Sequence, residues 1–355
     1  MSDFVRLDAG LRVGDHSVYK ADVYRNALEE DRSAAAGLVG CSPDEIALCE
    51  STTTAMNIVL WGLDLRPGDE IVSSRLENPA AVVPLRTVAA RRGVQVRWLD
   101  FRNGSAEAAL AFERAVTSRT RLLLLSDVDF AVGSRVDLGA ISALAHEYGV
   151  FVLADGAQAV GTTDVDVRAL GVDAYAFARH KFLCGPDGGG VLYLRQDVVS
   201  DIAPTFTGVF SDAEHGMAET EHIFVSPHRF DVSTRAVSAI AGATAATMWI
   251  REIGIDTVAR ATASRRQEVR ERLEAIPYVR MISPPSDEGG LLTFAIDGMT
   301  PDDLLAALAR QYVYGRTVVI TNPQGVRLSI GFWTRDDDVD AIERAVHRVA
   351  AGAPR

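Results

Sequence analysis

Lysine is almost missing from this sequence. Among 36 basic residues of the lysine and arginine types, only Lys20 and Lys181 are lysines. Arginine supplies the other cations, so a position that needs only a positive charge does not require lysine. Arginine cannot form a Schiff base, whereas a lysine amine in apolar surroundings has a lowered pKa and can. Because Lys181 follows the apolar stretch AYAF closely, we predict that it is kept for its amine chemistry.

Other absences exclude several classes of protein. The cysteines are few, odd in number and without metal-ligand spacing, which argues against a disulfide framework and a metal site: Cys41, Cys49 and Cys184. A formal net charge of −12 argues against a nucleic-acid or acidic-membrane partner. No apolar run approaches the ~20 residues of a membrane span, and the start MSDFVRLDAG lacks the regions of a signal peptide. We therefore expect a cytoplasmic protein.

The length and patterning predict an α/β protein of two domains. A chain of 355 residues exceeds the ~250–300 residues at which single cores stop growing. Apolar strands alternate with helices, as where RLLLLSDVDF, ISALAHEYG and VFVLAD follow one another, so we predict a doubly wound, mostly parallel sheet. From about residue 255 the pattern is typical of a small α+β domain. We predict a large domain over 15–254 and a small one over 255–355.

An acid and a lysine end two neighbouring apolar runs of the large domain. Asp155 ends VFVLAD, and Lys181 follows the next run. Pyridoxal 5'-phosphate (PLP) needs this pair, because a lysine binds its aldehyde and a carboxylate keeps its ring nitrogen protonated, so that the ring acts as an electron sink. The alternative is a buried acid and amine that only neutralise each other.

The segment around this pair resembles the class V, fold-type I PLP enzymes. That group includes cysteine desulfurases, isopenicillin N epimerase-like proteins and C–S lyases. Its pattern D-x-x-Q…D…H-K-x-x-x-G-P-x-G-x-G-x-L is matched by Asp155, Gln158, Asp173, His180, Lys181, Gly185, Pro186, Gly188 and Gly190. The resemblance implies a fold-type I transferase in which the N-terminal segment 1–14 packs near the small domain.

The same resemblance implies roles for the matched residues. Lys181 carries the Schiff base, Asp155 pairs with the ring nitrogen, and Gln158 hydrogen-bonds the ring hydroxyl. His180 contacts the phosphate and completes a catalytic set with Lys181 and Asp155.

Four hydroxyl residues, 51–54, precede a strong helical run. Hydroxyls and free backbone N–H groups at a helix start bind anions well. The resemblance puts Thr52 and Thr53 on the cofactor phosphate. Plain helix capping is the alternative.

Two further matches lie towards the C-terminus. Thr234 matches a threonine that reaches the phosphate of the neighbouring subunit, which implies a homodimer with shared active sites. Capping of the next helix by Ser233 or Thr234 is the other interpretation, and both can hold. Arg327 matches the arginine that forks onto the substrate carboxylate, for which a planar guanidinium suits better than lysine. A surface salt bridge is its alternative.

The pocket departs from the desulfurase pattern at several positions. Asn78, after Glu77, stands where those enzymes place a histidine over the ring, so we expect its amide to bind the cofactor there. Phe130 replaces an asparagine near the ring hydroxyl, and Ala178 replaces a phosphate-binding serine. The neighbouring Arg179 either compensates for that serine or faces solvent.

The reaction is argued from a missing thiol. Desulfurases take sulfur with a cysteine on a loop before the matched arginine, but YVYGRTVVITNPQGVRLS has none, and Cys184 follows Lys181 too closely for that task. We therefore expect C–S lyase-type β-elimination from a cysteine S-conjugate in specialised, antibiotic-type metabolism. Decarboxylative or oxidative variants, aminotransfer and epimerisation remain open, as does a non-catalytic binding protein of this fold.

Overall fold

The computed structural model describes residues 17–101, 105–213, 222–285 and 288–353. The segment 1–14, which we expected near the small domain, lies outside these residues. No helix in the described ranges is long and apolar enough to cross a membrane.

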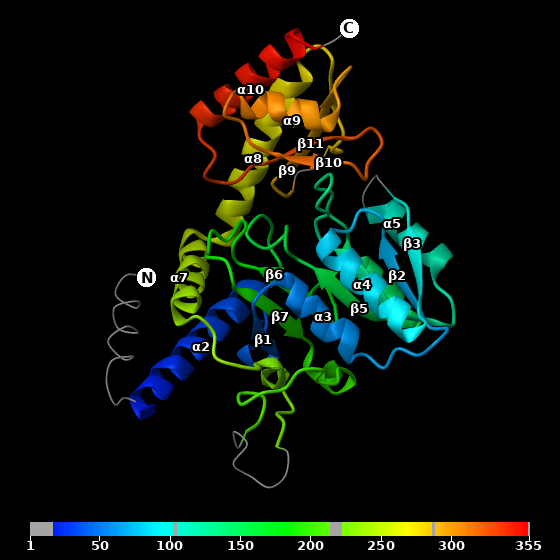
Figure 1. Cartoon of the computed structure of the whole chain (residues 1–355), viewed down its shortest axis with the longest axis vertical. Coiled ribbons are helices and arrows are strands. Elements are labelled where there is room, and N and C mark those ends of the chain that lie inside the picture. The colour runs from blue at the N-terminus through cyan, green and yellow to red at the C-terminus, as the bar shows by residue number, and fades with distance from the viewer. Residues whose placement is uncertain (1–16, 102–104, 214–221, 286–287, 354–355) are drawn as a thin grey trace.

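A seven-stranded sheet forms the centre of the larger part of the molecule, with strand order β1-β7-β6-β5-β4-β2-β3 (Figure 1). The strands are β1 Ile46–Cys49, β2 Glu70–Ser74, β3 Gln95–Leu99, β4 Thr120–Ser126, β5 Phe151–Asp155, β6 Ala174–Ala178 and β7 Gly190–Leu194. Only β7 runs antiparallel to its neighbours, β6 and β1. The predicted doubly wound, mostly parallel sheet is confirmed.

Helices cover both faces of this sheet. One face packs against α3 Thr52–Gly62 and α4 Pro79–Arg92. The other packs against α2 Ser17–Val39, α5 Ser105–Ala115, α6 Leu138–Glu147 and α7 Val237–Ile253. Strand β4 shows the consequence for the sequence: Leu122 and Leu124 join one core and Leu123 and Leu125 the other. A strand buried on both faces has an unbroken apolar run, which is the pattern that predicted it.

A second sheet, four-stranded and antiparallel with the order β10-β11-β9-β8, lies at the other end of the molecule (Figure 1). Its strands are β8 Val279–Met281, β9 Leu291–Ile296, β10 Arg316–Val318 and β11 Gly325–Ser329. Its helices are α8 Ile255–Glu274, α9 Pro301–Ala309 and α10 Asp336–Ala351. Gly254, with φ +89°, separates α7 from α8. The proposed domain division after residue 254 falls at this turn and stays a prediction.

The loop after β4 lies against the second sheet. Thr293 Oγ1 on β9 donates to the Ala131 carbonyl at 2.5 Å, and Ser283 Oγ donates to the Val132 carbonyl at 2.6 Å. At Gly133, a Cβ would come within 2.8 Å of Leu291, so the close approach requires glycine. These contacts place the neighbouring Phe130 beside the second sheet.

Aromatic rings also join the two parts. The Phe182 ring lies 5.8 Å from the Trp333 ring, which lies 5.0 Å from Phe332, and Phe332 lies 5.6 Å from Trp249 on α7. A Cβ at Gly290 would come within 2.7 Å of the Phe182 ring. Phe182, which follows Lys181, thus packs against the loops that flank strands of the second sheet.

Candidate active site

Asp155 lies at the carboxyl end of β5, the edge at which parallel α/β sheets bind their ligands. Its side chain is buried, and one carboxylate oxygen accepts a hydrogen bond from Ala157 N at 2.9 Å. Burial raises the pKa of Asp155, which the nearby Lys181 and the Ala157 N–H oppose. The site therefore holds a carboxylate whose charge depends on a neighbouring cation.

Lys181 follows the adjacent strand β6 and is half-buried. Burial lowers the pKa of Lys181; the charge of Asp155 opposes this effect, and Arg327 and Arg316 add to it. No hydrogen bond or ion pair holds the amine within the described ranges. An amine of lowered pKa without a fixed partner is available as a nucleophile and as a base.

Backbone hydrogen bonds close the loop that carries Lys181. Arg179 N donates to Gly189 O at 3.0 Å, and Gly185 N donates to Arg179 O at 2.8 Å. His180 lies exposed on this loop, with Nδ1 3.9 Å from Asp187 Oδ1. Its predicted contact with a phosphate stays a prediction.

Ser51 and Thr52, at the start of α3, have different hydrogen-bond partners. Ser51 is the N-cap, and its side chain accepts from Thr54 N at 3.1 Å. Capping therefore accounts for Ser51, whereas the Thr52 hydroxyl is buried and has no hydrogen-bond partner among the described residues. Gly190 keeps this turn close to β7, because a Cβ there would lie 2.4 Å from Ser51 N. An orphaned hydroxyl at a helix N-terminus fits an anionic group such as a phosphate.

Gln158 and Asn78 lie on turns that face this edge. Gln158 is buried on the turn after Asp155, where its carbonyl accepts from Thr162 Oγ1 at 2.7 Å. Asn78 is the N-cap of α4, and its Oδ1 accepts from Ala80 N at 2.9 Å. The cap fixes the orientation of the Asn78 amide, and the predicted cofactor contacts of both side chains stay predictions.

Arg327, on β11, is close enough to Asp129 for that charge to raise its pKa, but it forms no ion pair with an acid of the described residues. Its guanidinium donates through Nη1 to the Phe130 carbonyl and lies 5.7 Å from the centre of the Phe130 ring. No ion pair joins it to the described residues, so the surface salt bridge we considered is absent there. Burial, together with the nearby Arg316, lowers the pKa of Arg327 to about 10. An arginine that has no ion pair and whose charge acts on Lys181 is suited to bind a substrate carboxylate.

Arg316 is a candidate site residue that the sequence did not reveal. It lies on β10, directly opposite Arg327 in the β10–β11 register. Its charge lowers the pKa values of both Lys181 and Arg327. The signal in the sequence was weak, because the cross-strand pairing of positions 316 and 327 is visible only once the hairpin is known.

Arg179 corrects one expectation. It is buried rather than solvent-facing, and it forms an ion pair with Asp31 of α2. Thr244 Oγ1 of α7 donates to the same Asp31 oxygen at 2.9 Å. The guanidinium therefore belongs to the packing of α2 and α7 against the sheet, although its Nε and Nη2 have no partner among the described residues.

Asp173 matches the family pattern but lies at the opposite end of β6 from Lys181. Its carboxylate accepts from Val152 N at 2.7 Å and pairs with Arg195 at 2.7 Å and His146 at 3.0 Å. It therefore joins strands and helix α6 away from the site.

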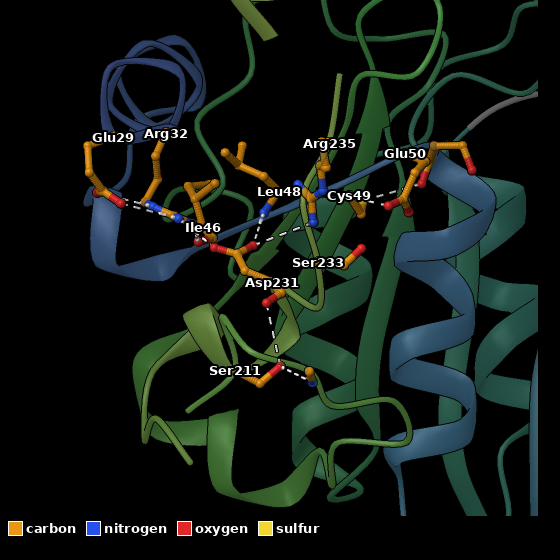
Figure 2. Close-up of polar contacts among 12 residues, drawn as sticks. Glu29, Arg32, Ile46, Leu48, Cys49, Glu50, Ser211, Asp231, Ser233 and Arg235 are labelled. Carbon is orange, nitrogen blue, oxygen red and sulfur yellow. Dashed lines mark hydrogen bonds and ion pairs between the residues drawn. The ribbon is translucent and has the colours of Figure 1, made fainter. Parts of the chain in front are cut away.

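A polar network fixes the segment around Thr234 (Figure 2). Asp231 pairs with Arg32 at 2.6 Å, accepts from Leu48 N at 3.2 Å, and lies 3.6 Å from Arg235. Thr234 itself is exposed. The N-cap of α7 is Ala236, without a side-chain hydrogen bond, so the alternative interpretation, capping by Ser233 or Thr234, was wrong.

No group of three or more potential metal ligands occurs in the described part of the chain. The family model described as "Aminotransferase class-V" matches residues 13–342. The chain belongs to this family.

Several curated relatives of the chain are named cysteine desulfurases. A "Probable cysteine desulfurase" of Methanothermobacter thermautotrophicus is 31% identical over 284 residues, which cover 79% of this chain and 70% of the relative. A "Cysteine desulfurase" of Synechococcus elongatus is 29% identical over 344 residues, covering 94% of this chain and 54% of the relative. The chain spans about half the length of two of the curated relatives that it matches.

Solved structures agree over nearly the whole chain. One, described as a complex between the cystine C–S lyase C-DES and its product cysteine persulfide, has a TM-score of 0.91 and 28% identity. It covers 99% of this chain and 93% of its own. A C-DES mutant with glycine covalently linked to the PLP cofactor also has a TM-score of 0.91, with 27% identity, covering 97% and 91%. The predicted fold-type I architecture is confirmed, and the protein is a PLP-dependent enzyme.

The residues present fit PLP. The amine of Lys181, the buried carboxylate of Asp155 and the orphaned hydroxyl of Thr52 offer partners for an aldehyde, a ring nitrogen and a phosphate. The Thr52→Val variant removes only the hydroxyl and should lower PLP affinity about tenfold, because a hydrogen bond to a charged group contributes about 1.5–3 kcal/mol. Equilibrium dialysis of the apoprotein measures this.

Thr54→Val is the matched control. Its hydroxyl already contacts Ser51 Oγ at 3.1 Å, so PLP affinity should stay within about twofold of wild type. Equal losses in both variants would show that the helix start, and not the Thr52 hydroxyl, binds the phosphate.

Proposed function

We propose that the protein is a C–S lyase that cleaves a cysteine S-conjugate by β-elimination. The reaction consumes the conjugate and water, breaks the Cβ–S bond, and releases pyruvate, ammonia and the free thiol. The observation that carries this proposal is an amine of lowered pKa, Lys181, close to two arginines that form no ion pair with the described residues, at a site without a reactive thiol.

Lys181 is the base of the proposed reaction. Bound PLP supplies an electron sink for the charge left on the substrate α-carbon. Because burial lowers the pKa of Lys181, a larger fraction of its Nζ is unprotonated and able to take the α-proton. Asp155 keeps the proton on the ring nitrogen through its charge.

Arg327 and Arg316 hold the substrate. Both face Lys181 closely enough to lower its pKa, and their strands pair at these residues. A carboxylate bound by such a guanidinium fork has a fixed orientation, which directs the α-carbon towards the amine. The Phe130 carbonyl already fixes one nitrogen of Arg327.

The thiols do not support persulfide chemistry. Burial raises the pKa of Cys41 and of Cys49 to about 12, and it also raises the pKa of the exposed Cys184. A thiolate, not a thiol, is the nucleophile that such chemistry requires. The loop 319–324 between β10 and β11 contains no cysteine.

The comparisons support this class of reaction. One structural neighbour is named a cystine C–S lyase, and several relatives are named cysteine desulfurases. The altered pocket residues Asn78, Phe130 and Ala178 motivate the further proposal of a substrate from specialised, antibiotic-type metabolism, handled in the cytoplasm.

Replacing Lys181 by Ala should abolish both covalent attachment of the cofactor and turnover. Borohydride reduction followed by peptide mass spectrometry should find the pyridoxyl group on Lys181 in the wild type and on no residue of the variant. A pyridoxyl group on Lys20 would contradict the assignment of the active-site amine.

Replacing all three cysteines by alanine should leave elimination intact, apart from a loss of stability at the buried Cys49. Turnover of a panel of cysteine S-conjugates measures elimination, which should release pyruvate and free thiol in equal amounts. A 2-keto acid that retains the sulfur substituent would show aminotransfer instead. Loss of turnover in a Cys184→Ala variant that folds and binds PLP would contradict elimination.

We also propose a homodimer with shared sites, because Thr234 is exposed on a rigidly held segment. Thr234→Val should weaken PLP binding in the dimer, whereas Ser233→Ala, at the adjacent exposed position, should not. Light scattering measures the oligomeric state, and equilibrium dialysis measures PLP affinity. An active monomer would rule the proposal out.

A further inference from the structure

Glu77 is a buried carboxyl group for which the proposed reaction has no use. It lies between β2 and α4 with 3% of its surface exposed. One oxygen accepts from Ser126 N at 2.9 Å and the other from Ser126 Oγ at 2.6 Å. No cation of the described ranges pairs with it. A buried, unpaired carboxylate is costly, so the group has reason to carry a proton.

Its surroundings are acidic. Ser126 ends β4 and lies opposite Asp155 in the β4–β5 register. The charges of Asp155 and Asp129 both disfavour ionisation of Glu77. On the same loop as Asp129, Asp127 is held by Arg135 at 3.1 Å and by the Tyr175 hydroxyl at 2.7 Å.

Asp155 and Glu77 differ in the cations near them. Asp155 has Lys181, whose charge favours the carboxylate, and Glu77 has only the uncharged donors of Ser126. Two close anions in a dry site cannot both be stable. The negative charge belongs on Asp155 and the proton on Glu77.

We propose that Glu77 is a positioning residue that holds a proton at neutral pH, so that Asp155 alone carries the negative charge behind the cofactor ring nitrogen. The 2.6 Å contact between Glu77 and Ser126 Oγ can serve this state with its direction reversed, because a protonated Glu77 oxygen would donate to the Ser126 hydroxyl while Ser126 N still donates to the other oxygen. The inference rests on the assignment of Asp155 to the ring nitrogen, and it does not depend on which bond the enzyme cleaves.

Burial raises the pKa of Glu77 from its ordinary 4.5 to about 8; the hydrogen bonds from Ser126 oppose the rise and the charge of Asp155 adds to it. Between these two values the folded protein keeps a proton that the unfolded chain has lost. Folding stability should therefore fall as the pH rises from about 5 to about 8, and this contribution should be constant above about 8.

Glu77→Gln replaces the neutral acid by a neutral amide of the same shape and removes this dependence. In urea titrations of the holoenzyme, the unfolding constant of wild type divided by that of E77Q should rise about tenfold per pH unit between pH 5.5 and 8, and then level off. A ratio that is constant over this range would overturn the proposal.

Glu70→Gln is the matched control. Glu70 is equally buried on β2, but hydrogen bonds from Thr117 and Arg119 outweigh its burial and lower its pKa. E70Q should lose stability by the same factor at every pH from 6 to 9. A merely structural role for Glu77 would give this flat pattern in E77Q as well.

Two spectroscopic measurements complete the test. At pH 7, E77Q should retain the absorption spectrum of the bound cofactor, whereas Asp155→Asn should change it; a changed spectrum in E77Q would contradict a neutral Glu77. If E77Q does not fold, pH-difference infrared spectra of wild type must show a protonated-carboxyl band that disappears above about pH 8. Its absence at pH 7 would refute the proposal. A titrating Glu77 in a protein without lyase activity would refute the proposed reaction alone.

Discussion

The burial of one amine beside one carboxylate at the edge of the large sheet is the constraint on which the rest of the site depends. Lys181 and Asp155 each have a pKa that burial shifts towards the neutral form, and each opposes that shift in the other. The pKa values of both groups therefore respond to any further charge placed near the pair. The surrounding residues can be understood by what they add to this balance: arginines from the second sheet on one side, and a carboxyl group without a cation on the other.

The second sheet supplies positive charge without neutralising it. Arg316 and Arg327 lie opposite each other on a hairpin, and the carbonyl of Phe130, on the loop after β4 of the first sheet, accepts a hydrogen bond from Arg327. Hydrogen bonds from Thr293 and Ser283 hold the loop of Phe130 against that hairpin's neighbours. The distance between the Lys181 amine and the arginines thus depends on contacts between the two parts of the molecule, so a change in their packing would alter the pKa of Lys181.

The sequence predicted that Asp155 and Lys181 lie close together, whereas their catalytic roles stay predictions. Asp155 and Lys181 end neighbouring apolar runs, and parallel strands bring such ends together. What it could not predict depended on pairing and on the face to which a side chain points. Arg316 became a site residue only through its register with Arg327. Arg179 follows an apolar strand like a solvent-exposed cation, but an acid far away in the chain, Asp31, makes its burial possible. The helix after Thr234 begins later than the hydroxyl residues suggested, at Val237.

The buried pair of Arg179 and Asp31 has a consequence for how this chain can diverge. Losing either partner leaves an uncompensated charge inside the large domain, at a cost of about 3–5 kcal/mol, while exchanging both for apolar residues is close to neutral. A lineage cannot readily pass through the single changes, so positions 31 and 179 should be inherited as a unit. Because Arg179 is two residues from Lys181, substitutions in helix α2 should be linked in evolution, as well as by packing, to the loop that carries Lys181.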